Sequence, residues 1–166
     1  MNSMLPYLED DLPLKPGDAV AAIVLTPDGR YVLQLRDRKR GIFFPDHWGL
    51  FGGGVESSDG GLKAAMRREL REELGIDVAE ERFSFFTRMT FDFSYCGLTD
   101  MFRIFYEVRL TEAEMQSAVL GEGSAFGAFA LTEALNELRL VPYDEMALWM
   151  HANGGRMRPH AQEAVR

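Results

Sequence analysis

The fold of this chain is decided by the stretch RELREELGI, residues 68–76. If the stretch is helical, its glutamates Glu69, Glu72 and Glu73 fall within an arc of roughly 100°, because successive residues advance by about 100°. The leucines between them point to an adjacent arc. Clustered carboxylates suit hard divalent cations, since Mg²⁺ and Mn²⁺ prefer oxygen ligands. The other interpretation is a solvent-exposed acidic face that pairs with neighbouring arginines, which is the commoner meaning of a charge run.

A helix through this stretch is supported by residues on both sides. Its apolar residues are spaced four apart: Leu62, Met66, Leu70 and Leu74. Gly75 is expected to end the helix in a left-handed conformation. The glycine run 52–54 precedes the helix by a short loop, where glycines allow a close backbone approach and let a carbonyl group face a metal ion. A plain turn is an equal alternative for that run.

Period-two alternation and apolar runs predict a mixed sheet covered by helices, an α/β fold. Asp18–Thr26 and Tyr31–Leu35 are expected to form a hairpin, because a Pro-Asp-Gly turn signal separates them. Residues 83–95 are expected to place their alternate phenylalanines on one packed face. The remaining predicted strands are 48–51, 101–110 and 125–130, and the remaining helices are 111–116, 132–138 (capped by Thr132) and 142–151.

Composition limits the class of protein. The chain has 166 residues, a net charge of −8 and one cysteine, which predicts one domain in a reducing, cytoplasmic setting without a disulfide. An acidic surface disfavours a nucleic-acid polymer as partner, and the longest apolar run, Ala19–Leu25, is too short to span a membrane. The expected organisation is an extended lead-in over 1–17, a domain over 18–153 and a flexible tail over 154–166.

Residues 52–76 together resemble the Nudix (MutT-like) hydrolase box, G-x5-E-x7-R-E-U-x-E-E-x-G-U, in which U is aliphatic. Its second half is matched at every specified position from Arg68 to Ile76. The first half of the box departs from the family pattern. Family spacing places Gly60 where the first box glutamate belongs, whereas alignment of residues 53–56 as G-x-[VI]-E places Asp59 there and leaves the loop one residue longer. We prefer the second alignment.

The resemblance extends beyond the box, to the segment 36–53 before it and to Leu120–Gly123 after it. It implies an α/β/α sandwich with a loop-helix-loop catalytic element. It also implies Mg²⁺-dependent hydrolysis, with Mn²⁺ as a substitute. The substrate implied is small and nucleotide-derived, a nucleoside diphosphate linked to another group, and a homodimer is compatible with the family. The alternative is a non-catalytic sensor module, from which one of the box acids would be expected to be missing.

The resemblance also implies roles for individual residues. Metal ligands would be Glu69, Glu72, Glu73 and the Gly53 carbonyl, and the catalytic acids would be Glu72, Glu73 and Glu122. Arg68 would be structural and would hold Asp59 or Glu56, while Gly75 would end the helix. Arg36, Arg38 and Lys39 would contact substrate phosphates. For Glu122 the alternative is an ordinary exposed glutamate, and for the basic residues it is a solvated loop.

Overall fold

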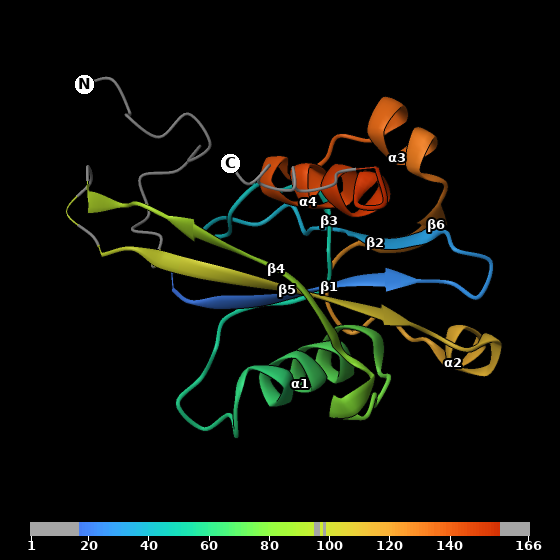
Figure 1. The fold of residues 1–166 in the computed structure, drawn as a ribbon, viewed down its shortest axis with the longest axis horizontal. Coiled ribbons are helices and arrows are strands. Elements are labelled where there is room, and N and C mark those ends of the chain that lie inside the picture. Colours follow the sequence, from blue (N-terminus) through green and yellow to red (C-terminus); the bar gives the residue numbers. More distant parts are fainter. Residues whose placement is uncertain (1–16, 95–96, 98, 157–166) are drawn as a thin grey trace, which may run out of the picture.

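The computed structural model describes residues 17–94, 97 and 99–156. Most of the predicted lead-in and tail, together with Tyr95 and Cys96, lies outside the described residues. The described chain forms a mixed sheet in the order β3-β2-β1-β5-β4, with β6 paired to β2 (Figure 1). The strands are β1 Ala19–Leu25, β2 Tyr31–Leu35, β3 Trp48–Gly49, β4 Ser84–Phe91, β5 Met101–Arg109 and β6 Ala125–Phe129.

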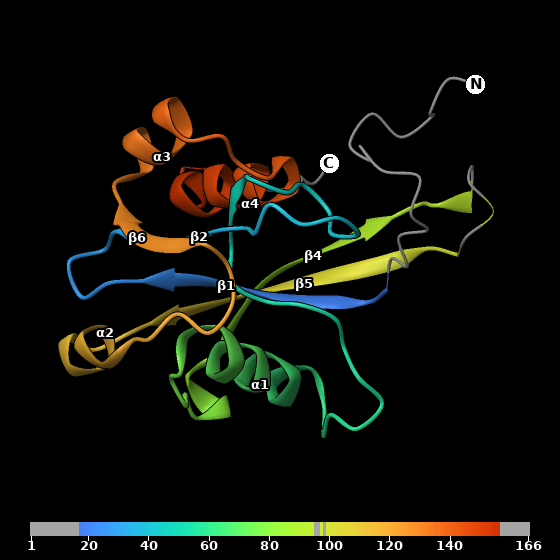
Figure 2. The ribbon, with the colours of Figure 1, turned by 180° about the vertical axis from the view of Figure 1, so that it is seen from behind.

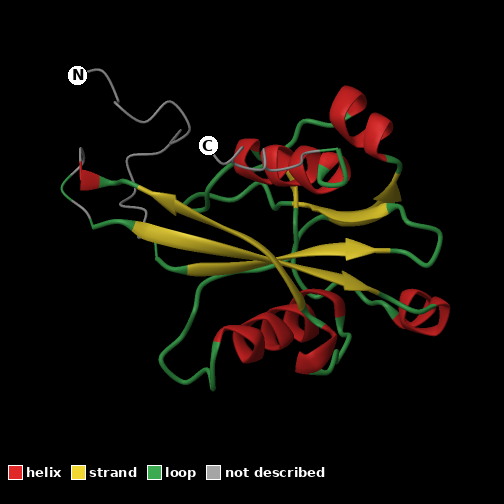
Figure 3. Ribbon diagram, viewed as in Figure 1, coloured by secondary structure: helices red, strands yellow, loops and turns green. Residues whose placement is uncertain are grey.

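Helices cover both faces of this sheet, so the predicted α/β/α sandwich is confirmed (Figures 1 and 2). One face carries α1 (Leu62–Leu74) with the 3-10 turn η1 (Glu80–Arg82), and α2 (Glu112–Ser117) flanks it. The opposite face carries α3 (Leu131–Glu137) and α4 (Pro142–Asn153). The long loop between β3 and α1 passes from one side of the sheet to the other (Figure 3).

The apolar run of β1 is explained by its central place in the sheet. β1 pairs antiparallel with β2 and parallel with β5. Its residues alternate between two buried clusters, with Val20, Ala22 and Val24 on the α1 side and Ala21 and Ile23 on the α4 side. A strand that is covered on both faces is apolar throughout. The predicted β1–β2 hairpin is confirmed.

Two local predictions are wrong. A bulge between Phe85 and Thr87 interrupts β4, so the alternate residues of 83–95 do not share one face. Phe83 packs in the α1-side cluster and Met89 against the α4-side cluster, while Phe85 is 63% exposed. The extra residue of a bulge shifts the alternation of the strand.

The helix predicted to begin after a Thr132 cap instead begins at Leu131, with Ala130 at the N-cap. The Glu133 carboxylate accepts a hydrogen bond from the Ala130 N–H at 3.3 Å, so an acid inside the first turn satisfies the free backbone donor. In contrast, the cap predicted at Thr111 is present as a full capping box with Glu114. Among the described residues, no helix is long and apolar enough to cross a membrane.

Candidate metal and catalytic site

The site is built around α1, which buries its leucines and turns its glutamates toward neighbouring loops. Leu70 and Leu74 are fully buried. Gly75 ends the helix with φ 68°, and its N–H donates to the Arg71 carbonyl at 3.0 Å. Glycine adopts this left-handed conformation without steric cost. The helix therefore ends at Leu74, with Gly75 as its C-cap, as its sequence predicts.

Glu73 is a buried carboxylate with two hydrogen-bond donors. Its Oε1 accepts from the Gln34 side-chain amide at 2.6 Å, and its Oε2 accepts from the Gly52 N–H at 2.7 Å. Burial raises the pKa of Glu73 to about 7, the charges of Glu69 and Glu122 add to the rise, and the two hydrogen bonds oppose it. This carboxyl group therefore changes its charge near neutral pH.

Arg68 connects the loop before α1 to two of the glutamates. Its guanidinium donates to Asp59 through Nε at 2.9 Å and Nη2 at 3.1 Å, and its Nη1 donates to Glu69 at 2.7 Å and Glu72 at 3.1 Å. Glu56 is 4.0 Å away, so Asp59 is the bidentate partner of the two candidates. The hydrogen bond from Arg68 lowers the pKa of Asp59. The shorter aspartate thus reaches the arginine from the longer loop.

Glycines let the segment 48–54 pass close to both β1 and α1. The Val20 N–H donates to the Gly53 carbonyl at 3.0 Å. A Cβ at Gly53 would lie 2.7 Å from both carboxylate oxygens of Glu69, and a Cβ at Gly52 would lie 2.2 Å from the Val20 carbonyl oxygen. Only residues without a side chain fit these two positions as the neighbouring groups stand.

The loop that carries Glu122 closes the C-terminal end of α1. The Val119 N–H donates to the Leu74 carbonyl at 2.9 Å, and the Gly121 N–H donates to the Glu73 carbonyl at 2.8 Å. These bonds satisfy carbonyls that a helix end leaves free. Glu122 is exposed, and its charge contributes to the raised pKa values of Glu69 and Glu73. The acid therefore lies within electrostatic range of the α1 carboxylates.

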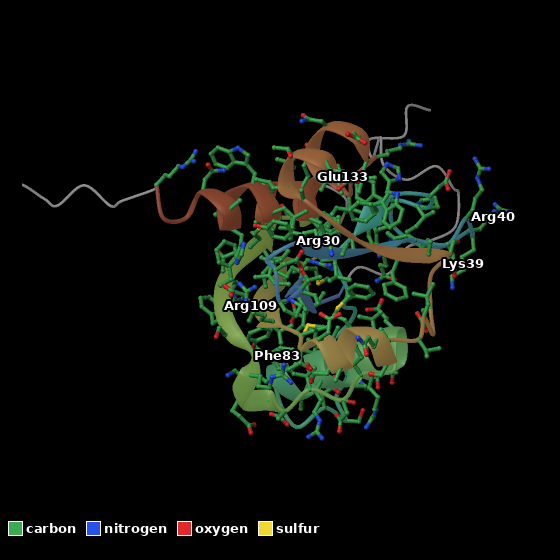
Figure 4. All side chains as sticks on the ribbon, turned by 90° about the vertical axis from the view of Figure 1, so that its right-hand side faces the viewer. Arg30, Lys39, Arg40, Phe83, Arg109 and Glu133 are labelled. Atoms are coloured by element: carbon green, nitrogen blue, oxygen red, sulfur yellow. The ribbon has the colours of Figure 1, made fainter. Side chains whose placement is uncertain are left out.

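The predicted phosphate-binding residues lie in the loop 36–47. The Arg36 Nε donates to the Phe43 carbonyl at 2.8 Å, Arg38 lies 3.5 Å from Asp46, and Lys39 lies 3.2 Å from Asp37. Figure 4 shows Lys39 extending outward from the edge of the molecule, beside Arg40. Among the described residues, none of the three predicted residues is hydrogen-bonded or ion-paired to the α1 glutamates. Asp37 of the same loop accepts a hydrogen bond from the Ser124 hydroxyl at 3.1 Å, two residues after Glu122.

The glutamates are engaged by protein partners. Arg68 holds Glu69 and Glu72, while Gln34 and Gly52 hold Glu73. In the described part of the chain, no three acidic, His or Cys side chains stand ready to hold a metal ion. Because Arg68 keeps its two bonds to Asp59 and one to the Gly54 carbonyl at 2.9 Å, Glu69 and Glu72 can turn away from it without leaving the guanidinium unpaired.

Sequence reasoning did not find three polar residues near the site, Gln34, Arg103 and Asp144. Gln34 is buried on β2 between Glu73 and the Leu50 carbonyl. Arg103 on β5 lies 3.4 Å from Asp144 on α4, and its guanidinium stacks over the ring of Tyr143, also on α4. No sequence signal singles out Arg103, because its face of β5 also carries Glu107 and Arg109 and alternates with the buried apolar face, as in a half-buried strand.

The class of protein follows from this arrangement and from comparison with known proteins. The family model of the NUDIX domain matches residues 15–159. The chain therefore belongs to the Nudix family, and it is a hydrolase that acts on pyrophosphate bonds. Comparison with curated proteins gives no significant match.

Solved structures share the fold. A MutT protein from Methanosarcina mazei Go1 superposes with a TM-score of 0.69 at 18% identity, covering 88% of this chain and 99% of the other. A MutT Nudix hydrolase from Burkholderia pseudomallei gives a TM-score of 0.63 at 25% identity, covering 81% and 97%. The Nudix domain of Shewanella oneidensis NrtR, solved with ADP ribose, gives 0.64 at 19%, covering 94% and 100%.

Proposed function

We propose that this hydrolase uses Mg²⁺, or Mn²⁺ in its place, to cleave the diphosphate bond of a nucleoside diphosphate linked to another group. The observation that carries the proposal is the surplus of carboxylates at α1. Glu69, Glu72 and Glu73 come from the C-terminal half of α1, and the charge of Glu122 acts on Glu69 and Glu73. Arg68 is bonded to Glu69 and Glu72. Such a surplus in a partly buried site is unfavourable until a cation neutralises it.

The donor set fits a hard divalent cation. All of the candidate ligands are oxygen atoms, from Glu69, Glu72, Glu73 and the Gly53 carbonyl, and hard cations select oxygen. The absence of a side chain at Gly53 leaves room beside the Glu69 carboxylate. When bound, the metal would neutralise the pyrophosphate and lower the pKa of a bound water molecule.

The residues of this chain have separate tasks in the proposed reaction. Glu69, Glu72 and Glu73 would hold the cation, and the Gln34 amide and Gly52 N–H would fix the orientation of Glu73. Glu122, which the loop 119–121 places beside the end of α1, would orient the attacking water or accept its proton. Arg68 and Asp59 would keep the loop before α1 in place.

Basic residues would meet the substrate. Arg36, Arg38 and Lys39 lie in the loop that precedes the glycine segment and would bind the substrate phosphates. In the structure, their partners are Phe43, Asp46 and Asp37 of the same loop. The proposed substrate is a small nucleotide derivative, not a nucleic-acid polymer, because the net charge of −8 repels a long phosphate chain. The NrtR domain supports a nucleotide-sized ligand, since it was solved with ADP ribose.

The test is a screen of nucleoside diphosphate derivatives with Mg²⁺ and with Mn²⁺, scored by phosphate release after coupling to a phosphatase. Nucleoside triphosphates, nucleotide sugars, ADP-ribose and dinucleoside polyphosphates form the panel. We expect turnover of at least one class that is abolished by a chelator and lost in Glu73→Gln. Binding of a panel member without turnover would favour the sensor alternative and contradict the proposal.

A further inference from the structure

The backbone of Leu50 lies in the middle of a series of hydrogen bonds that runs through the sheet. On the α4 side, its N–H donates to Asp144 Oδ2 at 2.9 Å. On the α1 side, its carbonyl accepts from the Gln34 amide at 3.4 Å, and the same amide donates to Glu73 at 2.6 Å. The backbone N–H and carbonyl of one residue, Leu50, therefore connect α4 to the carboxylate of α1.

Asp144 and its partner are buried on the face away from the glutamates. Asp144 is 1% exposed, and its Oδ1 lies 3.4 Å from the Arg103 Nη2. Arg103 Nε and Asp144 Oδ1 have no hydrogen-bond partner in the described part of the chain. A buried pair with unmade hydrogen bonds contributes little net stability. Within the described ranges, the side chains of this pair make one hydrogen bond, in which Asp144 Oδ2 accepts from the Leu50 N–H.

The geometry of the site depends on the peptides that follow Leu50. The Gly52 N–H donates to Glu73 at 2.7 Å, and Gly53 lies against the Glu69 carboxylate. The backbone of Gly49 also packs closely against Asp144, because a Cβ at Gly49 would lie 2.8 Å from Asp144 Oδ2. Asp144 thus limits where residues 49–53 can lie relative to α1.

We propose that Asp144, which is ion-paired with Arg103, is a positioning residue for the metal site. It fixes the Leu50 peptide from the far face of the sheet, and thereby holds Gly52 and Gly53 against the glutamates of α1. This inference rests on the proposed function. It adds that the affinity of the acidic cluster for a divalent cation depends on a residue that contacts no member of that cluster.

The test uses two double variants that differ only in the acceptor offered to Leu50. Arg103→Met/Asp144→Asn removes both charges but keeps an oxygen that can accept from the Leu50 N–H. Arg103→Met/Asp144→Leu removes both charges and the acceptor, in a side chain of similar size. Comparison of the two therefore separates the effect of the hydrogen bond to Leu50 from the effect of the ion pair.

The primary measurement is the dissociation constant of Mn²⁺, determined by electron paramagnetic resonance of the unbound ion, which needs no substrate. We expect the Asn variant to stay within about threefold of wild type, and the Leu variant to bind roughly 10- to 100-fold more weakly, the usual cost of losing a group that orients a metal ligand. Amide hydrogen exchange at Leu50 should be faster only in the Leu variant. For a substrate found in the screen, kcat should fall with little change in KM.

A destabilised variant tests whether a loss of stability alone weakens Mn²⁺ binding. Leu25→Ala opens a cavity at the opposite end of β1 from the site, and it should lower the melting temperature without weakening Mn²⁺ binding. If the Asn and Leu variants bind Mn²⁺ equally well, or if the change is confined to KM, Asp144 is not a positioning residue for the metal. If wild-type protein does not bind Mn²⁺, the proposed function itself fails and the positioning role fails with it.

Discussion

The two faces of the sheet each bury a charged cluster, and the clusters are balanced differently. On the α4 face, Arg103 faces Asp144 as one cation against one anion. On the α1 face, Arg68 faces Asp59, Glu69 and Glu72, whereas the partners of Glu73 among the described residues are the neutral Gln34 amide and Gly52 N–H. The first cluster neutralises itself. The second keeps negative charge in surplus, which is the property that a cation site requires.

The largest expected effect comes from removing that surplus. Glu69→Gln and Glu73→Gln should each reduce kcat by roughly 10³-fold or more, because metal stabilisation of transition-state charge amounts to several kcal/mol. Millimolar Mg²⁺ should raise the melting temperature of wild type more than that of either variant. An equal rise in all three proteins would show that these side chains do not bind the ion.

The next largest loss of activity is expected from substitution of Glu122, an acid that lies outside α1. Glu122→Gln should lower kcat by roughly 10²- to 10⁴-fold with little change in KM, the usual contribution of a general base. Sequence reasoning would choose Glu107 and Glu114 as exposed controls. The structure makes both unsuitable, because Glu107 lies 3.0 Å from His151 Nε2 and Glu114 pairs with Arg82.

Glu112 is the better control, because it is exposed on the same short helix α2 as Glu114. Glu112→Gln should leave kcat unchanged. If Glu122→Gln keeps wild-type kcat on a verified substrate, Glu122 is an ordinary surface residue and the base must be sought among Glu72, Glu73 and Glu56.

Adjacent glycines provide a sharper comparison within the loop. A Cβ at Gly53 would meet the Glu69 carboxylate at 2.7 Å, whereas one at Gly54 meets nothing within 4 Å. Gly53→Ala should therefore weaken Mn²⁺ binding by roughly 10- to 100-fold, as expected when a ligand is displaced. Gly54→Ala should bind like wild type in the same titration. Equal binding by the two variants would remove Gly53 from the site.

Substitution of the loop acid Asp59 should reduce kcat less than substitution of the glutamates of α1. Asp59→Ala removes the bidentate partner of Arg68 and leaves the guanidinium to Glu69 and Glu72, where it competes with a cation. We expect a loss of about tenfold in kcat, in the range for groups that support a metal ligand. Glu56→Ala, at 4.0 Å from Arg68, should cost less. A greater loss in Asp59→Ala than in Glu72→Gln would require a larger role for this loop.

The smallest effect is a pH dependence of stability. The pKa of Glu73 is about 7 in the folded protein and about 4.3 when unfolded, so between these values the folded state binds more protons. The free energy of unfolding of the metal-free protein should therefore fall as the pH rises from 5 to 7.5. Thermal melts should show this decline in wild type and a smaller one in Glu73→Gln. A stability that rises over this interval would contradict the raised pKa.

Much of the fold could be predicted from the sequence where local patterns decide it. The helix through residues 62–74 follows from its four-residue spacing and from Gly75, and β5 follows from its in-phase apolar residues. The irregular positions could not be predicted. The bulge after Phe85 depends on how β4 pairs with β5, and the start of α3 depends on a side-chain contact from Glu133.

By itself, the sequence determined the acidic face of α1, the glycines beside it and the resemblance to the Nudix box, because these depend on spacing along one helix and one loop. Only the tertiary structure decided which loop acid holds Arg68, since a longer loop brings the shorter Asp59 within reach while Glu56 stays farther away. It alone placed Gln34 against Glu73, and Asp144 against Leu50. These partners lie on different strands and helices, and no spacing along the chain encodes which side chains meet when a sheet is packed between helices.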